Sequence, residues 1–126
     1  RGTLNNDSHN LQKERVLQAY QDIGQEILAH IGDKPWDEAE GKYGVFSQMI
    51  SKQWWFRHGS NIEHMGASKI PSEIRTAASE SIYYLHQHLF ELTGDRIWGL
   101  TFTLYPTGKF NIDYDYNKPA DYEGTD

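Results

Sequence analysis

The sequence predicts an α+β fold, a two-layer domain in which two helices pack on one face of an antiparallel four-stranded sheet, in the order α-β-β-α-β-β. Two observations support this prediction. Two segments repeat apolar residues at spacings of three and four, which is typical of amphipathic helices. Other short segments alternate apolar and polar residues, which is typical of strands with one buried face. Because each element has one apolar face, two layers around one core are the economical arrangement, and the strand order stays open.

The first helix is expected over residues 8–31, after a polar segment at 1–7 that we expect to be disordered. Asp7 or Ser8 suits the N-cap, and Gly32 suits the end of the helix. One apolar stripe runs along this helix and consists of Val16, Tyr20, Ile23, Ile27 and Ile31. The 126 residues are long enough for one domain with a core of its own, and we expect 1–126 to form it.

Two strands are expected next, at 42–50 and 53–58, joined near Ser51-Lys52. Both are rich in aromatic and apolar residues, which favour strands. The segment 33–41 before them contains proline and glycine, and the segment 59–69 after them is polar with two glycines. Both segments are therefore expected to be loops.

The second helix is expected to open at Pro71-Ser72-Glu73 and to stop at Thr93-Gly94. Proline at a helix entry and glutamate in the first turn both suit a helix N-terminus, and glycine suits its end. The apolar stripe of this helix consists of Ile74, Ala78, Ile82, Leu85, Leu89 and Leu92.

A hairpin from Trp98 to Asp115 supplies the last two strands, with a turn at Pro106-Thr107-Gly108. The apolar face of the first strand consists of Trp98, Leu100, Phe102 and Leu104, and that of the second of Phe110, Ile112, Tyr114 and Tyr116. The opposite face of the second strand carries Lys109, Asn111, Asp113 and Asp115. Residues 117–126 form a polar, acidic tail.

The composition argues for a basic protein partner. The formal net charge is −6 at pH 7, whereas nucleic acids and anionic membrane surfaces require basic proteins. The chain has no cysteine, which excludes disulfides and thiolate chemistry and is compatible with a reducing cytosol. No apolar run approaches the roughly 18 residues of a membrane helix. We therefore expect a cytoplasmic protein.

Sequence motifs for catalysis, cofactors or metals are missing. His86 and His88 lie two apart on a helix and point away from each other, so they cannot chelate one ion together. No nucleophile elbow, phosphate-binding loop or zinc motif is present. We expect no catalytic residues, no cofactor and no metal.

Asp113 and Asp115 are the residues best placed for chemistry or binding. They share one strand face roughly 7 Å apart. That spacing suits two acids of a hydrolase, ligands of a divalent cation, or contacts to a partner's lysine or arginine. An ordinary solvated strand face also has this spacing.

The aromatic run Trp54-Trp55-Phe56 has two interpretations. Stacking platforms for single-stranded nucleic acid interleave aromatic and basic residues, and only Lys52 and Arg57 flank this run. Core packing of Trp54 and Phe56 explains it better. Trp55 then points to the other face, where it can serve as an interface anchor.

The C-terminal half resembles the YezG-like immunity proteins, small cytoplasmic bacterial antitoxins paired with polymorphic or contact-dependent toxins. Residues 70–126 carry the resemblance, in Trp98, Gly108-Lys109-Phe110, Asp113-Tyr114-Asp115-Tyr116 and Pro119-Ala120-Asp121-Tyr122-Glu123. The Trp54-Trp55-Phe56 run departs from the family, which usually has Tyr and Phe there. Family members commonly continue past the position of Asp126, so the resemblance implies a longer C-terminal segment.

The resemblance implies an immunity protein that blocks a cognate secreted toxin, such as a nuclease, at its active site or a nearby exosite. An acidic inhibitor suits the basic cleft of a nuclease, because complementary charge speeds encounter. The residues expected to contact the toxin are Trp55, Asp113, Asp115, Tyr116, Asp121, Tyr122 and Glu123. A carboxylate-dependent, metal-assisted hydrolase is the alternative, followed by a regulatory or scaffolding module. The toxin's identity and the oligomeric state stay open.

Overall fold

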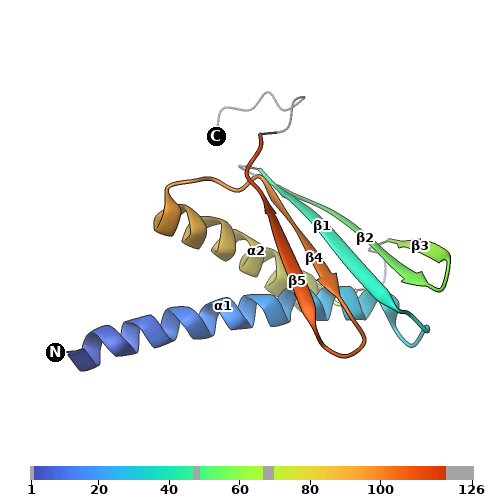
Figure 1. Cartoon of the computed structure of the whole chain (residues 1–126), viewed down its shortest axis with the longest axis horizontal. Helices are drawn as coiled ribbons and strands as arrows, with labels where there is room; N and C mark the ends of the chain where they lie inside the picture. Colours follow the sequence, from blue (N-terminus) through green and yellow to red (C-terminus); the bar gives the residue numbers. More distant parts are fainter. Residues whose placement is uncertain (1, 47–48, 67–69, 119–126) are drawn as a thin grey trace.

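The computed structural model describes the backbone of residues 2–46, 49–66 and 70–118, and their side chains from Lys13 onward. These described residues form two helices and one antiparallel sheet of five strands (Figure 1). In chain order the elements are α1 (Gly2–Ile31), β1 (Glu38–Val45), β2 (Ile50–His58), β3 (Asn61–Met65), α2 (Ser72–Thr93), β4 (Gly99–Leu104) and β5 (Phe110–Asp115). The α+β class is confirmed, and the prediction of four strands is wrong by one.

The helix ends follow from local residue chemistry. α2 starts after Pro71 and stops at Gly94, whose φ of 77° is left-handed and whose N–H donates to the Phe90 carbonyl. α1 also stops before a left-handed glycine, Gly32. α1 begins at Gly2, however, so the predicted helix start at residue 8, with a cap at Asp7 or Ser8, is wrong. Once a helix has nucleated, each further residue costs little, and no proline interrupts this segment.

The first two strands are displaced from their predicted positions. β1 starts at Glu38 and β2 at Ile50, so Ser51 and Lys52 lie within β2 and not in a turn. Two adjacent polar residues are compatible with a turn, but Ser51 and Lys52 pair with Gly44 and Tyr43 on β1 and so continue the strand. Gly41, interpreted as a loop residue, lies within β1. A Cβ there would lie 2.7 Å from the Tyr43 hydroxyl oxygen, so glycine serves close packing.

β3 lies in the segment 59–69 that was expected to be a loop. It pairs with β2 across a two-residue turn, in which Gly59 has a φ of 62°. Most of its residues are exposed on both faces. An exposed edge strand needs no apolar alternation, which explains why the pattern missed it.

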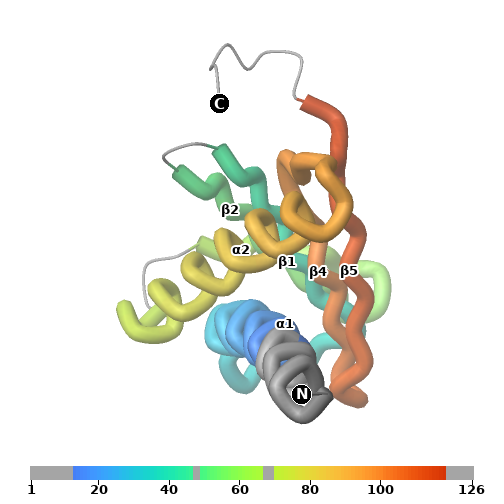
Figure 2. Tube along the Cα trace, turned by 90° about the vertical axis from the view of Figure 1, so that its left-hand side faces the viewer, coloured from blue at the N-terminus to red at the C-terminus, as the bar shows by residue number. Residues whose placement is uncertain are grey.

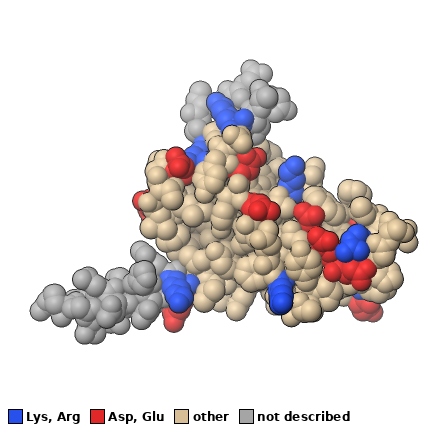
Figure 3. Space-filling model, viewed as in Figure 1, with Lys and Arg blue, Asp and Glu red and all other residues tan. Residues whose placement is uncertain are grey.

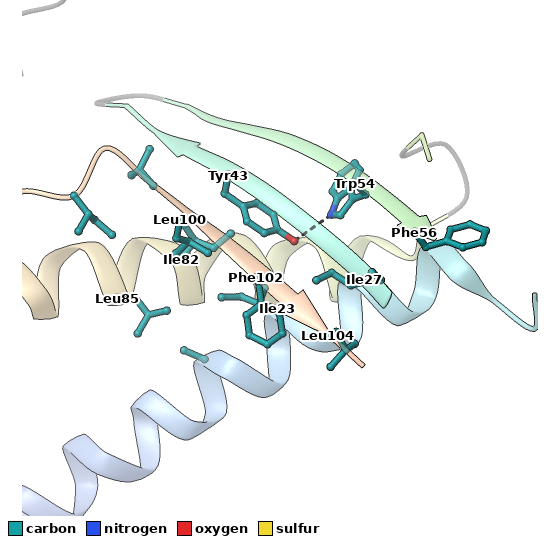
Figure 4. Packing of buried hydrophobic residues seen from close by; sticks show 14 of the residues in the cluster. Ile23, Ile27, Tyr43, Trp54, Phe56, Ile82, Leu85, Leu100, Phe102 and Leu104 are labelled. Atoms are coloured by element: carbon teal, nitrogen blue, oxygen red, sulfur yellow. Dashed lines mark hydrogen bonds between the residues drawn. The ribbon is translucent and has the colours of Figure 1, made fainter. Parts of the chain in front are cut away.

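The sheet has the order β3-β2-β1-β4-β5, and every neighbouring pair is antiparallel. Figure 2 shows α1 and α2 packed beside each other next to the strands. Both helices and the sheet contribute to one buried cluster (Figure 4). Its larger members are Ile23, Ile27, Ile31, Tyr43, Val45, Trp54, Phe56, Ile82, Leu85, Ile97, Leu100, Phe102 and Leu104. The face of the sheet that contributes to this cluster is called the inner face below, and the other is called the outer face. The side chains on the outer face form the candidate site.

Candidate binding face

The strand register places Asp113 in a polar row across the outer face. Asp113 on β5 lies opposite Thr101 on β4, and Thr101 lies opposite Lys42 on β1. Lys42 in turn lies opposite Gln53 on β2. Cross-strand partners share a face, so these four side chains form one row. All but the half-buried Thr101 are exposed.

Trp55 belongs to the adjacent row. It lies opposite Glu40 on β1, which lies opposite Thr103 on β4 and, through it, Asn111 on β5. Trp55 is two residues from Gln53, so both rows share the outer face. The prediction that Trp55 points away from Trp54 and Phe56 is confirmed: those two are buried, and Trp55 is half-buried against His64, with ring centroids 6.1 Å apart.

Both carboxylates of the predicted pair lie in water. Asp113 accepts a hydrogen bond from the Asn111 side-chain amide at 3.2 Å, and Asp115 accepts one from the Asn117 backbone N–H at 3.0 Å. Both residues are exposed, and neither has an ion pair among the described residues. Uncompensated carboxylates on an open strand are available to a cationic partner.

Two further acids extend the outer face towards β2. Glu38 and Glu40 lie on β1 in alternate positions, and the Arg57 guanidinium lies 3.3 Å from a Glu38 carboxylate oxygen. Glu38, Glu40, Trp55, Arg57 and Ile62 line one small depression. Ile62 on β3 is 62% exposed, although it is apolar. Figure 3 shows acidic side chains, with basic ones between them, over the strands on the right of the view.

A hollow of about 360 Å³ lies at the other end of the outer face. Gly44 and Gly99 lie opposite each other there on β1 and β4, and both line the hollow. Asp115 and Lys42 line the hollow with opposite charges. Asp115 thus stands at the edge of an open depression and does not point into the core.

Tyr116, which is predicted to contact a partner, and Tyr114, which precedes it by two residues, differ in exposure. Tyr116 is 47% exposed, so it remains available as an anchor. Its neighbour Tyr114 packs against the core, where burial, followed by the proximity of Tyr20, raises its pKa. Asp121, Tyr122 and Glu123 lie outside the described residues.

Sequence reasoning missed a buried polar cluster that joins α1 to the sheet. Glu26 is fully buried; Lys52 donates to one of its carboxylate oxygens at 2.8 Å and the Tyr43 hydroxyl to the other at 3.2 Å. The Trp54 indole N–H donates to the Tyr43 hydroxyl oxygen at 3.1 Å (Figure 4). Burial, followed by the Glu26 charge, raises the Tyr43 pKa well above its ordinary value. The available signal was Glu26 itself, an acid three residues after Ile23 in the apolar stripe.

Within residues 13–46, 49–66 and 70–118, no group of three or more His, Cys, Asp or Glu side chains is placed to hold a metal ion. Neither helix, over its described part, is apolar enough to cross a bilayer. Compared with known proteins, the chain matches no family model and no curated protein sequence.

Proposed function

We propose that this chain is an immunity protein that binds a cognate secreted bacterial toxin, a nuclease by preference, and neutralises it by stoichiometric blocking. The observation that carries the proposal is the outer face, where exposed Asp113 and Asp115 share one surface with the half-buried aromatic anchor Trp55. Tight inhibitors combine charge that steers encounter with aromatic anchors that hold the complex.

The charge balance supports a basic partner. A nuclease presents cations to phosphates, and a net charge of −6 attracts such a surface. Asp113 and Asp115 lie in water before binding, and a partner's lysine or arginine can reach them without rearrangement of the sheet. The inhibitor would cover the toxin's active site or an exosite beside it.

The proposal assigns different roles to the two faces of the sheet. In it, both helices cover the inner face and build the core, which leaves the outer face free for the toxin. The resemblance of residues 70–126 to the YezG-like immunity proteins supports this role and a cytoplasmic location, where the producing cell needs protection.

Co-expression tests the proposal. The chain is produced with and without the product of the adjacent upstream gene, and cell growth and co-purification are measured. We expect rescue of growth and a stable complex. Asp113→Lys combined with Asp115→Lys should weaken both. Glu80→Lys combined with Glu91→Lys, at exposed positions of α2, makes the same charge change away from the outer face and should have a smaller effect.

Three other outcomes would contradict the proposal. Metal-dependent turnover by the chain alone, abolished by Asp113→Asn, would indicate the hydrolase. Binding without rescue of growth would indicate a scaffolding or regulatory module. If the chain neither binds the neighbouring product nor rescues growth, that product is excluded as the partner, and the immunity role as proposed is excluded with it.

A further inference from the structure

β5 forms one edge of the sheet. Within residues 2–46, 49–66 and 70–118 it pairs with β4 alone. A strand in this position presents a row of backbone N–H and C=O groups that another strand can pair with.

The hydrogen bonds of the β4–β5 hairpin show which backbone groups face this edge. The carbonyls of Lys109 and Asp115 accept from the N–H groups of Tyr105 and Trp98, at 2.9 and 2.6 Å. Backbone direction alternates along an antiparallel strand, so odd-numbered residues of β5 point their backbone groups at β4. The N–H and C=O groups of Ile112 and Tyr114 therefore point to the edge.

The two sides of β5 differ in chemistry. On the outer face stand the exposed carboxylates of Asp113 and Asp115. On the inner face, Phe110 is 44% exposed and stands beside a groove of about 740 Å³ between α1 and the hairpin. The apolar lining of the groove includes Leu17, Tyr20, Leu28, Phe102, Leu104 and Phe110. Leu17 and Leu28 are 49% and 41% exposed.

β3 forms the opposite edge of the sheet and is protected against pairing with a further strand in a way that β5 is not. On β3, Glu63 lies opposite Phe56 and so occupies an inner-face position, where its carboxylate is 2.6 Å from the Lys34 ammonium. A charge on the inner face of an edge strand opposes further pairing. The inner-face positions of β5 are Phe110, Ile112 and Tyr114, without any charge.

Asp113 and Asp115 also restrict which strand can pair with β5. A second copy of β5 would place carboxylates beside carboxylates, and like charges on neighbouring strands are destabilising. A strand with lysine or arginine at these positions would instead form opposite-charge pairs. The edge thus disfavours self-association and favours a basic strand.

We propose that β5 accepts one extended strand of the partner protein, antiparallel to β5, as a sixth strand of the sheet. The outward side chains of that strand are lysine or arginine beside Asp113 and Asp115, and its inward side chains are apolar and cover the groove beside Phe110. Main-chain hydrogen bonds to Ile112 and Tyr114 hold the strand, and the alternating side chains select it. The inference rests on the proposed function for the basic character of the partner, and it adds how that partner is held.

A cyclic β-hairpin peptide tests the pairing directly. One strand of the probe alternates lysine and valine, with the valine N–H groups on its free edge; cyclisation reduces the entropy cost of binding. In antiparallel pairing, residues opposite Ile112 and Tyr114 direct their N–H groups to β5, so valine N–H groups should form the bonds. We expect N-methylation of these valines to weaken binding at least about tenfold in fluorescence anisotropy. Replacement of lysine by glutamate should abolish binding at low salt.

Amide hydrogen exchange of the whole chain locates the probe. We expect the exchange of Ile112 and Tyr114 to slow on binding, while Asn111 and Asp113, already bonded to β4, change little. In the Asp113→Lys/Asp115→Lys variant the preference should reverse, so that the glutamate probe binds better than the lysine probe. The Glu80→Lys/Glu91→Lys variant should keep the original preference.

Equal binding of the parent and N-methylated probes, or unchanged exchange at Ile112 and Tyr114, would overturn the inference. The proposed function fails separately. If co-expression rescues growth but the probe ignores β5, the immunity role stands and the strand pairing falls. If the probe pairs with β5 and growth is not rescued, the pairing stands and the immunity role falls.

Discussion

Lys52 on β2 reaches through the interior to Glu26 on α1, with its Nζ atom 2.8 Å from a carboxylate oxygen that water does not contact. The Lys52 side chain is 15% exposed and that of Glu26 is 0% exposed. Tyr43 satisfies the second oxygen, and Trp54 in turn donates to Tyr43. Side chains from two strands, Lys52 on β2 and Tyr43 on β1, therefore bind the buried Glu26 carboxylate. These contacts fix how α1 lies against the sheet.

Removal of the cation alone should be costly. In Lys52→Met, the Glu26 carboxylate stays buried and loses its only charged partner among the described residues. Breaking a buried pair in this way typically costs about 3 to 5 kcal/mol. We expect a loss of that size in the free energy of unfolding, measured by urea denaturation at neutral pH.

The second variant of this pair separates charge from packing. Glu26→Gln in the Lys52→Met background removes the stranded charge and keeps an oxygen that can accept from Tyr43. Most of the lost stability should return in the double variant. If Lys52→Met alone is nearly neutral, Glu26 is not held by this ion pair.

The accuracy of the sequence prediction followed how local the relevant signal was. Both ends of α2 lie within the short segments predicted for them, because Pro71 and Gly94 each act on their own helix end. Lys52 was misplaced into a turn because its partner, Glu26, lies 26 residues away and in another element. Local periodicity contains no information about such a pairing.

The candidate site was predicted in part for the same reason. Alternation along one strand shows that Asp113 and Asp115 share a face, and likewise that Trp55 opposes Trp54. That all three belong to the same side of one sheet depends on the order of β2, β1, β4 and β5. Strand order arises from long-range pairing, and no single segment reveals it.

Two glycines should respond to alanine in opposite directions. A Cβ at Gly99 would lie 2.5 Å from the Tyr43 carbonyl oxygen, so the β1–β4 pairing must shift. We expect Gly99→Ala to lower the free energy of unfolding by about 1 to 3 kcal/mol. Gly24 lies inside α1, where a Cβ would meet only the Phe102 ring at 3.9 Å. Gly24→Ala should raise it by about 0.5 to 1 kcal/mol, since glycine weakens a helix interior.

Chemical denaturation of the two alanine variants beside the wild type checks this pair. The two changes add the same methyl group, so a difference in sign reports the local backbone and packing. Equal effects would show that close approach at Gly99 does not determine its residue type.

His30 should make stability depend on pH. Its ring packs against Trp54 in a tilted arrangement with centroids 3.9 Å apart, and its Nε2 atom is buried with no hydrogen-bond partner among the described residues. Burial lowers the His30 pKa below 6.5, opposed by a backbone hydrogen bond with Gly66 and assisted by the Lys52 charge. Between the folded and unfolded pKa values, the unfolded chain therefore binds more protons.

The sign of this effect follows from that difference. His30 imposes no penalty above pH 6.5, and the free energy of unfolding falls as the pH decreases from there towards the folded-state pKa. We expect His30→Phe, which keeps an aromatic ring against Trp54 and cannot titrate, to lose less stability than the wild type from about pH 7.5 to about pH 5. Urea denaturation across this range provides the measurement, and parallel profiles of the two proteins would contradict the assignment.

If the partner is the proposed basic toxin, salt should slow their association more than it speeds their dissociation. Exposed charges such as Asp113 and Asp115 attract a basic partner over a screening length of about 30 Å at 0.01 M salt and about 8 Å at 0.15 M. We expect the association rate, measured by stopped-flow fluorescence, to fall at least about tenfold over this range, with a much smaller change in the dissociation rate. Asp113→Lys/Asp115→Lys should lower the rate at low salt and flatten its salt dependence. Glu80→Lys/Glu91→Lys, with the same net charge, should flatten it less. A rate that ignores salt would reject the outer face as the steering surface and leave the immunity role to be judged by growth rescue, because steering and neutralisation depend on different properties of the complex.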